Sequence, residues 1–94
     1  MSKTRPGVVV SNDYANSGSK RVSIVPITSS RIEKVFPFEV LLKVTTETGL
    51  SFDSKAACDQ VRTIDKRRLL KKIGSLSGDT IEKIKAALRL HFDL

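Results

Sequence analysis

Short runs of apolar residues, separated by polar turn formers, divide the first half of the chain into strand-sized segments. Three of these segments are rich in β-branched or aromatic residues; they are residues 8–10, 22–27 and 36–42, of which the last two each contain one polar residue, Ser23 and Glu39. Mainly apolar segments of this length are typical of strands that are buried in a sheet. Pro26 lies inside the second run. Because proline has no N–H to donate, it indicates an edge, a bulge or the end of that strand.

The second half of the chain begins with a weaker strand pattern and continues with short elements. Residues 56–64 alternate in part and predict a fourth strand; one of its faces carries Ala57, Asp59, Val61 and Thr63. Residues 65–70 are interpreted as a short helical turn, and residues 72–76 as a short strand or an extended piece. The polar segments between elements predict turns or loops at 11–13, 16–19, 28–31 and 45–49.

The chain ends in an amphipathic helix, predicted over residues 78–91. Ser77 is suited to cap it, and Asp79 lies in the first turn, where a carboxylate meets the positive end of the helix dipole. The stripe predicted to face the core consists of Ile81, Ile84, Leu88 and Phe92. The order of elements predicts a single α+β domain over residues 1–94, with a barrel-like sheet and a terminal helix.

Charge changes this picture by suggesting a partner. The chain has 94 residues and a net charge of +7, with 17 Lys and Arg against 10 Asp and Glu. A small basic domain most often binds nucleic acid or an acidic protein. Aromatic residues make up 5% and tryptophan is absent, which disfavours a continuous base-stacking platform. No apolar run approaches the roughly 18 residues of a membrane span, and no signal-peptide pattern is found, so we expect a cytoplasmic protein without a membrane partner.

The densest basic run is Lys66-Arg67-Arg68 with Lys71-Lys72. It is interpreted either as a solvated face or as a surface that steers a nucleic-acid backbone. The spacing of the charges leaves both interpretations open.

Metal and nucleophile chemistry have little support in the sequence. One cysteine, Cys58, and one histidine, His91, fall short of a zinc ligand set. We predict that Cys58 packs in the core and that His91 is exposed near the helix C-terminus. No Gly-rich phosphate loop or Ser-His-Asp arrangement is suggested, so neither a metal nor a cofactor is expected.

Polar side chains at two strand ends form the remaining candidate site. Arg5 stands before the first strand, and Thr28 ends the second. If these strands are antiparallel neighbours, both residues lie at one edge of the sheet. A guanidinium beside a hydroxyl suits a phosphate, because the guanidinium fork donates two hydrogen bonds. The alternative is that both are ordinary surface residues.

The residues around these positions resemble the MazF/PemK family of toxin endoribonucleases. The order and spacing agree from Arg5 to the end of the chain. The matching stretches are RPGVVVSND (5–13), VPITS (25–29), FPFEVLL (36–42), DQVRTIDKRRL (59–69) and IGSLS (73–77).

The resemblance implies a small SH3-like β-barrel of the CcdB/PemK type with a C-terminal helix. It also implies a homodimer that cuts single-stranded RNA at short specific sequences without a metal, by attack of the 2′-hydroxyl on the adjacent phosphate. An antitoxin with an acidic C-terminal segment inhibits such toxins. By the same resemblance Arg5 and Thr28 are the catalytic pair, and the substrate-contacting positions are Asn12, Ser29, Ser30 and Gln60.

The family usually has a further strand and loop before its Arg-Pro pair, so we expect either that the true start lies upstream or that this form is shortened at the N-terminus. Two alternatives stay open. The protein is a non-catalytic relative that binds RNA or antitoxin, or a gyrase-poisoning toxin of the same fold. The Arg-Pro and Thr-Ser positions favour the nuclease.

Overall fold

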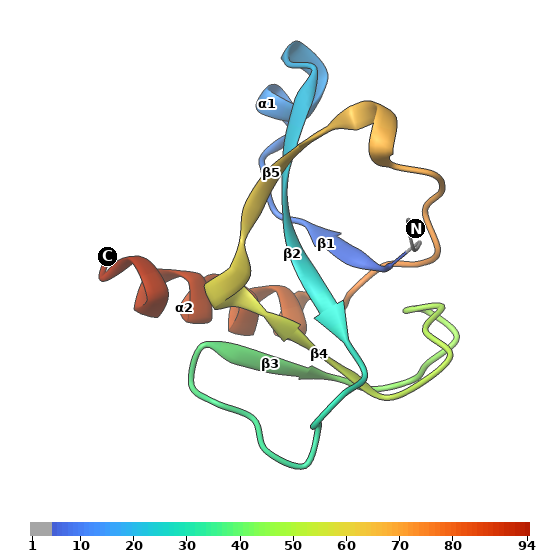
Figure 1. The fold of residues 1–94 in the computed structure, drawn as a ribbon, viewed down its shortest axis with the longest axis vertical. Helices are drawn as coiled ribbons and strands as arrows, with labels where there is room; N and C mark the ends of the chain where they lie inside the picture. The colour runs from blue at the N-terminus through green and yellow to red at the C-terminus, as the bar shows by residue number, and fades with distance from the viewer. Residues whose placement is uncertain (1–4) are drawn as a thin grey trace.

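The computed structural model describes residues 5–94, an α+β domain in which every strand pair is antiparallel (Figure 1). Its elements are β1 (Gly7–Val9), α1 (Asp13–Gly18), β2 (Arg21–Thr28), β3 (Glu39–Leu42), β4 (Ser54–Ala57), the 3-10 turn η1 (Cys58–Gln60), β5 (Arg62–Asp65), the 3-10 turn η2 (Lys66–Arg68) and α2 (Gly78–Phe92). The strand order is β1-β2-β4-β3, and β5 also pairs with β2. Within residues 5–94 no pairing joins β1 to β3, so the described sheet is open.

β2 is the strand on which the sheet is built. It pairs with β1 along one side and with both β5 and β4 along the other. Ile24 lies opposite Arg62, and Ile27 lies opposite Ala56, so three steps along β2 correspond to six along its partner segment. The three additional residues form η1, which divides the predicted strand 56–64 into two short strands. That single-strand prediction was therefore wrong, because its alternating pattern did not reveal the inserted turn.

Pro26 lies inside β2, which is a central strand, and η1 explains why it is tolerated there. The Ile27 N–H donates to the Pro6 carbonyl at 3.1 Å, so it points toward β1. Successive residues of a strand point their backbone groups to opposite sides, so the nitrogen of Pro26 faces the β4–β5 side. On that side β5 pairing ends at Ile24 and β4 pairing starts at Ile27. The missing N–H therefore falls at a gap in the ladder.

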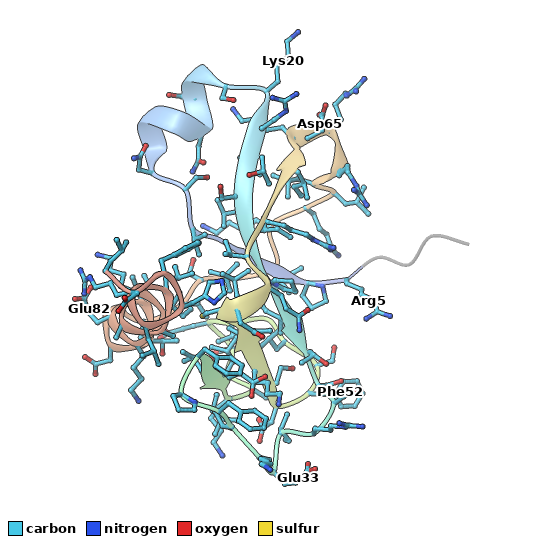
Figure 2. The ribbon with its side chains drawn as sticks, turned by 60° about the vertical axis from the view of Figure 1, so that its left-hand side comes forward. Arg5, Lys20, Glu33, Phe52, Asp65 and Glu82 are labelled. Carbon is cyan, nitrogen blue, oxygen red and sulfur yellow. The ribbon has the colours of Figure 1, made fainter. Side chains whose placement is uncertain are left out.

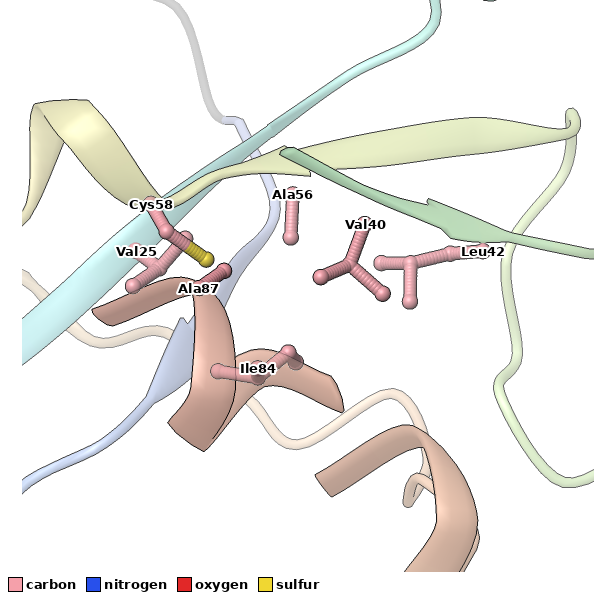
Figure 3. Close-up of a cluster of buried hydrophobic side chains, with 7 residues drawn as sticks. All are labelled: Val25, Val40, Leu42, Ala56, Cys58, Ile84 and Ala87. Carbon is pink, nitrogen blue, oxygen red and sulfur yellow. The ribbon is translucent and has the colours of Figure 1, made fainter. Parts of the chain in front are cut away.

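α2 packs across one face of the sheet and closes the core. Figure 2 shows the helix nearly end-on, and Figure 3 shows the buried cluster between helix and strands. The cluster consists of Val25, Val40, Leu42, Ala56, Cys58, Ile84 and Ala87. The burial of Leu42, which is 2% exposed, contributes about 1.5–3 kcal/mol.

The start of α2 was predicted correctly, but its buried stripe was only partly so. The Ser77 hydroxyl accepts a hydrogen bond from the Thr80 N–H, and the helix begins at the next residue. Its buried face is formed by Ile84 and Ala87, with Leu88 packed beside them. The predicted stripe members Ile81 and Phe92 are 42% and 55% exposed. Phe92 lies in the last turns of the helix, which run past the strands in Figure 1.

Three other predicted segments differ from the structure. The turn signals of residues 11–19 include α1, whose start is marked by a hydrogen bond from the Asn16 N–H to the Asn12 carbonyl at 2.9 Å. The third strand begins at Glu39 rather than at Phe36. In place of its first residues a turn is closed by the Glu39 N–H on the Phe36 carbonyl at 2.8 Å.

Residues 72–76, predicted as a short strand or an extended piece, form no strand. They are attached to the loop after β3 by one backbone hydrogen bond, from the Ser75 N–H to the Glu47 carbonyl at 2.7 Å. Gly74 allows this approach, because a Cβ there would lie 2.3 Å from the carbonyl oxygens of Glu47 and Thr48. Gly49, in the loop after β3, lies against the same segment and has a φ of 67°. Among residues 5–94, no helix has both the length and the apolar character that a membrane crossing requires.

Candidate functional site

Arg5 and Thr28 lie opposite each other at one end of the β1–β2 pair. The register runs from Val9 opposite Ile24 to Gly7 opposite Pro26, and the Ile27 N–H continues it to the Pro6 carbonyl. One more step places Arg5 across from Thr28. Residues that are directly opposite in an antiparallel pair share a face, with Cβ atoms about 4.5–5.5 Å apart. The predicted antiparallel pairing of these strands is confirmed, and it brings the two predicted residues together.

Arg5 is exposed, and Figure 2 shows its side chain extending from the outer end of β1. A guanidinium presents several N–H donors in a planar fork that matches the oxygens of a phosphate. Arg5 thus presents this fork to solvent at the start of β1.

Thr28 is half-buried, and its hydroxyl oxygen is held by a hydrogen bond from the backbone. The Ser30 N–H donates to Thr28 Oγ1 at 3.1 Å, in a turn formed by the hydroxyl and the backbone two residues later. A hydroxyl has one O–H donor and two lone pairs. Because the amide occupies one lone pair, the O–H of Thr28 stays available to donate to a ligand beside Arg5.

Ser29 and Ser30 directly follow Thr28, and both are exposed. Ser29 also lines a hollow of about 550 Å³ between the loops that follow β2 and β3. The remaining lining residues are Ile32, Val44, Ser51, Phe52 and Asp53. This hollow adjoins the end of β2, so a molecule bound between Arg5 and Thr28 can extend into it.

Phe52 is a feature of this hollow that the sequence analysis missed. Its side chain is 69% exposed, which is unusual for an aromatic residue. An exposed ring can stack on a nucleobase, which is worth about 1–3 kcal/mol per base. The available signal was its position between the polar residues Ser51 and Asp53, outside every apolar run.

The other two predicted contact residues lie away from Arg5 and Thr28. Gln60 is exposed in η1, on the β4–β5 side of β2, rather than on a strand. Asn12 follows β1, whereas Arg5 precedes it, so the strand separates them. Any ligand that touches all of these residues must be an extended molecule.

The first part of the basic run, η2, lies at the opposite end of β2 from Thr28. Arg21 pairs with Asp65, and Figure 2 shows Lys20 and Asp65 together at that end of the molecule. Asp65 caps η2: its Oδ1 accepts from the Arg67 N–H at 2.9 Å and from Arg67 Nε at 3.2 Å. These hydrogen bonds hold the pKa of the Asp65 carboxyl below its usual range, and the one from the Arg67 side chain has the largest effect. Arg67 is therefore held in a local turn by Asp65, and the exposed cations of the run face solvent.

Cys58 and His91 are placed as predicted. Cys58 is fully buried, and this burial, followed by the charges of Asp59 and Glu39, raises the pKa of its thiol from 9.0 to about 11. Such a thiol is unsuited to act as a nucleophile at neutral pH. His91 is exposed in the last turn of α2. In the described part of the chain no three His, Cys, Asp or Glu side chains are grouped so that they could hold a metal ion.

An antiparallel sheet covered by a C-terminal helix, with a guanidinium and a hydroxyl at one strand edge, defines a small α+β domain suited to an extended anionic ligand. Residues 1–92 match the family of PemK-like, MazF-like toxins of type II toxin–antitoxin systems. The chain belongs to this family.

Two curated relatives of the chain are endoribonucleases. MazF9 of Mycobacterium tuberculosis is 48% identical over 95 residues, covering 96% of this chain and 79% of that protein. EndoA of Bacillus subtilis is 32% identical over 90 residues, covering 96% and 77%. The MazF-like fold is also found in solved structures. The toxin MazF-mt6 of Mycobacterium tuberculosis has a TM-score of 0.84 at 26% identity, over 96% of this chain and 87% of that one. A mycobacterial endoribonuclease in complex with its cognate antitoxin has a TM-score of 0.84 at 26% identity, over 96% and 82%.

Proposed function

We propose that this toxin-family protein is an endoribonuclease that cuts single-stranded RNA at short specific sequences without a metal. The observation that carries the proposal is the register that sets Arg5 opposite Thr28 at one end of the β1–β2 pair. Two relatives that are endoribonucleases, at 48% and 32% identity, support the same activity.

The chemistry needs little from the protein besides charge and positioning. The 2′-oxygen of a ribose attacks the adjacent phosphorus, and the bond from phosphorus to the 5′-oxygen breaks. One proton leaves the 2′-hydroxyl and one is gained by the departing 5′-oxygen, which yields a 2′,3′-cyclic phosphate and a 5′-hydroxyl. Because the RNA supplies its own nucleophile, DNA is not a substrate.

In this reaction Arg5 stabilises the charge that develops on the phosphoryl oxygens. Arginine keeps its proton under all ordinary conditions, so we assign it charge stabilisation rather than the role of base. Thr28 donates its O–H to the same phosphate, oriented by the amide of Ser30. A preorganised donor of this kind is typically worth 10²- to 10³-fold in kcat, that is about 3–4 kcal/mol.

We assign substrate contacts to Ser29 and Ser30 beside the scissile phosphate, and to Gln60 and Asn12 farther along the strand. The separation of Asn12 from Arg5 by β1 fits a bound strand of several nucleotides. Single-stranded RNA suits such contacts, because its bases are free to be splayed and read.

The family also suggests partners and assembly. We propose a cognate antitoxin with an acidic C-terminal segment, a homodimeric toxin, and a cytoplasmic site of action. The net charge of +7 and a structural relative solved with its cognate antitoxin support the antitoxin. We further propose that the sheet is an SH3-like barrel, in support of which β2 is shared by strands on both of its sides.

The test is cleavage of a long RNA in EDTA, with the cuts mapped by primer extension. We expect discrete cuts by the wild-type protein that are lost in Arg5→Ala and kept in Arg89→Ala, an exposed arginine on α2. A 2′-deoxy nucleotide at the cut position should block cleavage. Intact RNA with the wild-type protein would refute the proposal. Binding of RNA or antitoxin without cleavage would then favour the non-catalytic alternative.

A further inference from the structure

Lys55 is a buried lysine whose ammonium group makes three contacts. The residue is 5% exposed. Its Nζ donates to the carbonyl of Arg31 at 3.1 Å, to the carbonyl of Lys34 at 3.0 Å, and to Glu39 Oε1 at 3.0 Å. Lysine is almost never buried to this extent unless it is paired. The sequence analysis gave it no role, because it lies among the small residues of a buried strand.

Glu39 is the first residue of β3 and lies at the end of the β2–β3 loop, which also contains Arg31 and Lys34. Its side chain is 9% exposed, and Oε1 also accepts from the Phe36 N–H at 3.0 Å. The Lys55–Glu39 ion pair therefore fixes the backbone of the β2–β3 loop at positions 31, 34 and 36. Buried ion pairs can often be replaced by apolar residues without loss of stability. Holding a particular loop conformation is thus a better explanation for this pair than stability alone.

The contacts lead from Lys55 to Thr28. Arg31 has a φ of 53°, a left-handed conformation that is unfavourable for a residue with a Cβ. Its carbonyl is held there by Lys55 Nζ and by the Lys34 N–H. Arg31 directly follows Ser30, whose N–H holds Thr28 Oγ1 at 3.1 Å. The turn that orients the hydroxyl is therefore continuous with the residue that Lys55 constrains.

Lys55 also supports Thr28 through the backbone, because the two residues are partners in the β2–β4 register. One residue thus fixes the strand that carries Thr28 and the turn that orients its side chain. Strained backbone of this kind persists where the surrounding structure holds it, and it is frequent at functional sites.

We propose that Lys55 is a positioning residue for RNA cleavage, which acts through Arg31 and Ser30 on the hydroxyl of Thr28, with Glu39 holding its ammonium in place. The inference rests on the proposed function. Lys55 is buried, so its loss leaves the exposed cations that bind RNA unchanged. We therefore expect the loss of Lys55 to lower kcat while KM stays nearly constant. Misplacement of a catalytic group by about 1 Å can cost roughly 10²-fold, and we expect Lys55→Met to lose about 10- to 100-fold in kcat.

The experiment compares Lys55→Met with Lys85→Met in the full-length chain. Lys85 forms an ion pair with Glu82 at 3.2 Å on α2, but its side chain is 56% exposed. The readouts are kcat and KM on a short RNA that spans a mapped cut, and the ¹H–¹⁵N signal of Ser30. We expect Lys55→Met to lose kcat and to shift the Ser30 signal, with a steeper temperature coefficient as its hydrogen bond weakens. Lys85→Met should retain both, and Glu39→Gln, which keeps an acceptor oxygen, should retain most of kcat.

Each outcome supports or overturns the role proposed for Lys55. Wild-type kcat in Lys55→Met, an unchanged Ser30 signal, or an equal loss in Lys85→Met overturns the inference. If Lys55→Met does not fold, the double variant Lys55→Met/Glu39→Gln, which buries no charge, takes its place with the same expectations. If the wild-type protein cuts no RNA, the proposed function fails, while the Ser30 signal still reports whether Lys55 holds the turn.

Discussion

Arg5 lies opposite Thr28 in the register of β1 and β2, although the two residues are far apart in the sequence. Each is an ordinary surface residue when taken alone. The pairing places the guanidinium of Arg5 and the hydroxyl of Thr28 on the same face, at one end of the β1–β2 pair.

Replacement of Arg5 by lysine should be nearly as harmful as removal of the side chain. A lysine ammonium is a point charge and cannot reproduce the planar fork of a guanidinium. We expect Arg5→Lys to lower kcat/KM by about 10²-fold, a typical loss for one oxyanion donor. Steady-state cleavage of a short RNA measures the effect, with Arg89→Lys as the matched control. A variant within twofold of wild type would show that charge alone suffices.

Thr28→Val should abolish the donor while keeping the shape of the side chain. We expect kcat to fall by about 10²- to 10³-fold, with little change in the free energy of unfolding, because the Ser30 amide is exposed and can bind water instead. Thr28→Ser keeps a hydroxyl that can accept from Ser30 and donate to phosphate, so it should retain most of the activity. Similar kinetics for the two variants would contradict the role of the hydroxyl.

Cys58 should make the protein less stable in alkali. Burial raises the pKa of its thiol from 9.0 to about 11, so between these values the folded state keeps a proton that the unfolded state has lost. Stability is therefore fully present below about pH 9 and falls as the pH rises through the folded pKa, by about 3 kcal/mol in total. Urea unfolding between pH 8 and 11 measures the slope, and Cys58→Ala should flatten it. The same burial predicts that a thiol reagent labels Cys58 only after unfolding.

Gly74 and Gly78 form a matched pair for testing the attachment of the segment before α2. A Cβ on Gly74 would lie 2.3 Å from two backbone oxygens, whereas nothing lies within 4 Å of a Cβ on Gly78. Gly74→Ala should therefore lower the free energy of unfolding by about 1–3 kcal/mol. Gly78→Ala, at the first position of the helix, should leave it unchanged or raise it by up to about 1 kcal/mol. Equal effects of the two changes would mean that the contact with residues 47–48 is not tight.

The sequence was informative wherever a property depends on neighbours along the chain. The apolar runs located β1 and β2, Ser77 located the start of α2, and the antiparallel rule brought Arg5 to Thr28. Cys58 and His91 were assigned correctly, because each is the single residue of its type in the sequence.

The failures have causes that the pattern of apolar and polar residues does not show. Phe36 was assigned to a strand, but the carboxylate of Glu39 accepts from its N–H and a turn forms instead. The three residues of η1 are set by the register of β2 against two separate partners, which no local pattern encodes. Lys55 received no role from the sequence, yet it is buried against a carboxylate and two carbonyl groups from the loop before β3.

The pairing of Thr28 with Lys55 has a consequence for the order in which the chain is made. While ribosomes are still adding the residues of β4, the first half of the molecule has neither the backbone partner of Thr28 nor the ammonium that holds the following turn. On the proposed mechanism, an incomplete chain therefore carries Arg5 and Thr28 without the geometry that cleavage requires. A toxin of this design would leave the mRNA that encodes it uncut until most of its own translation is complete.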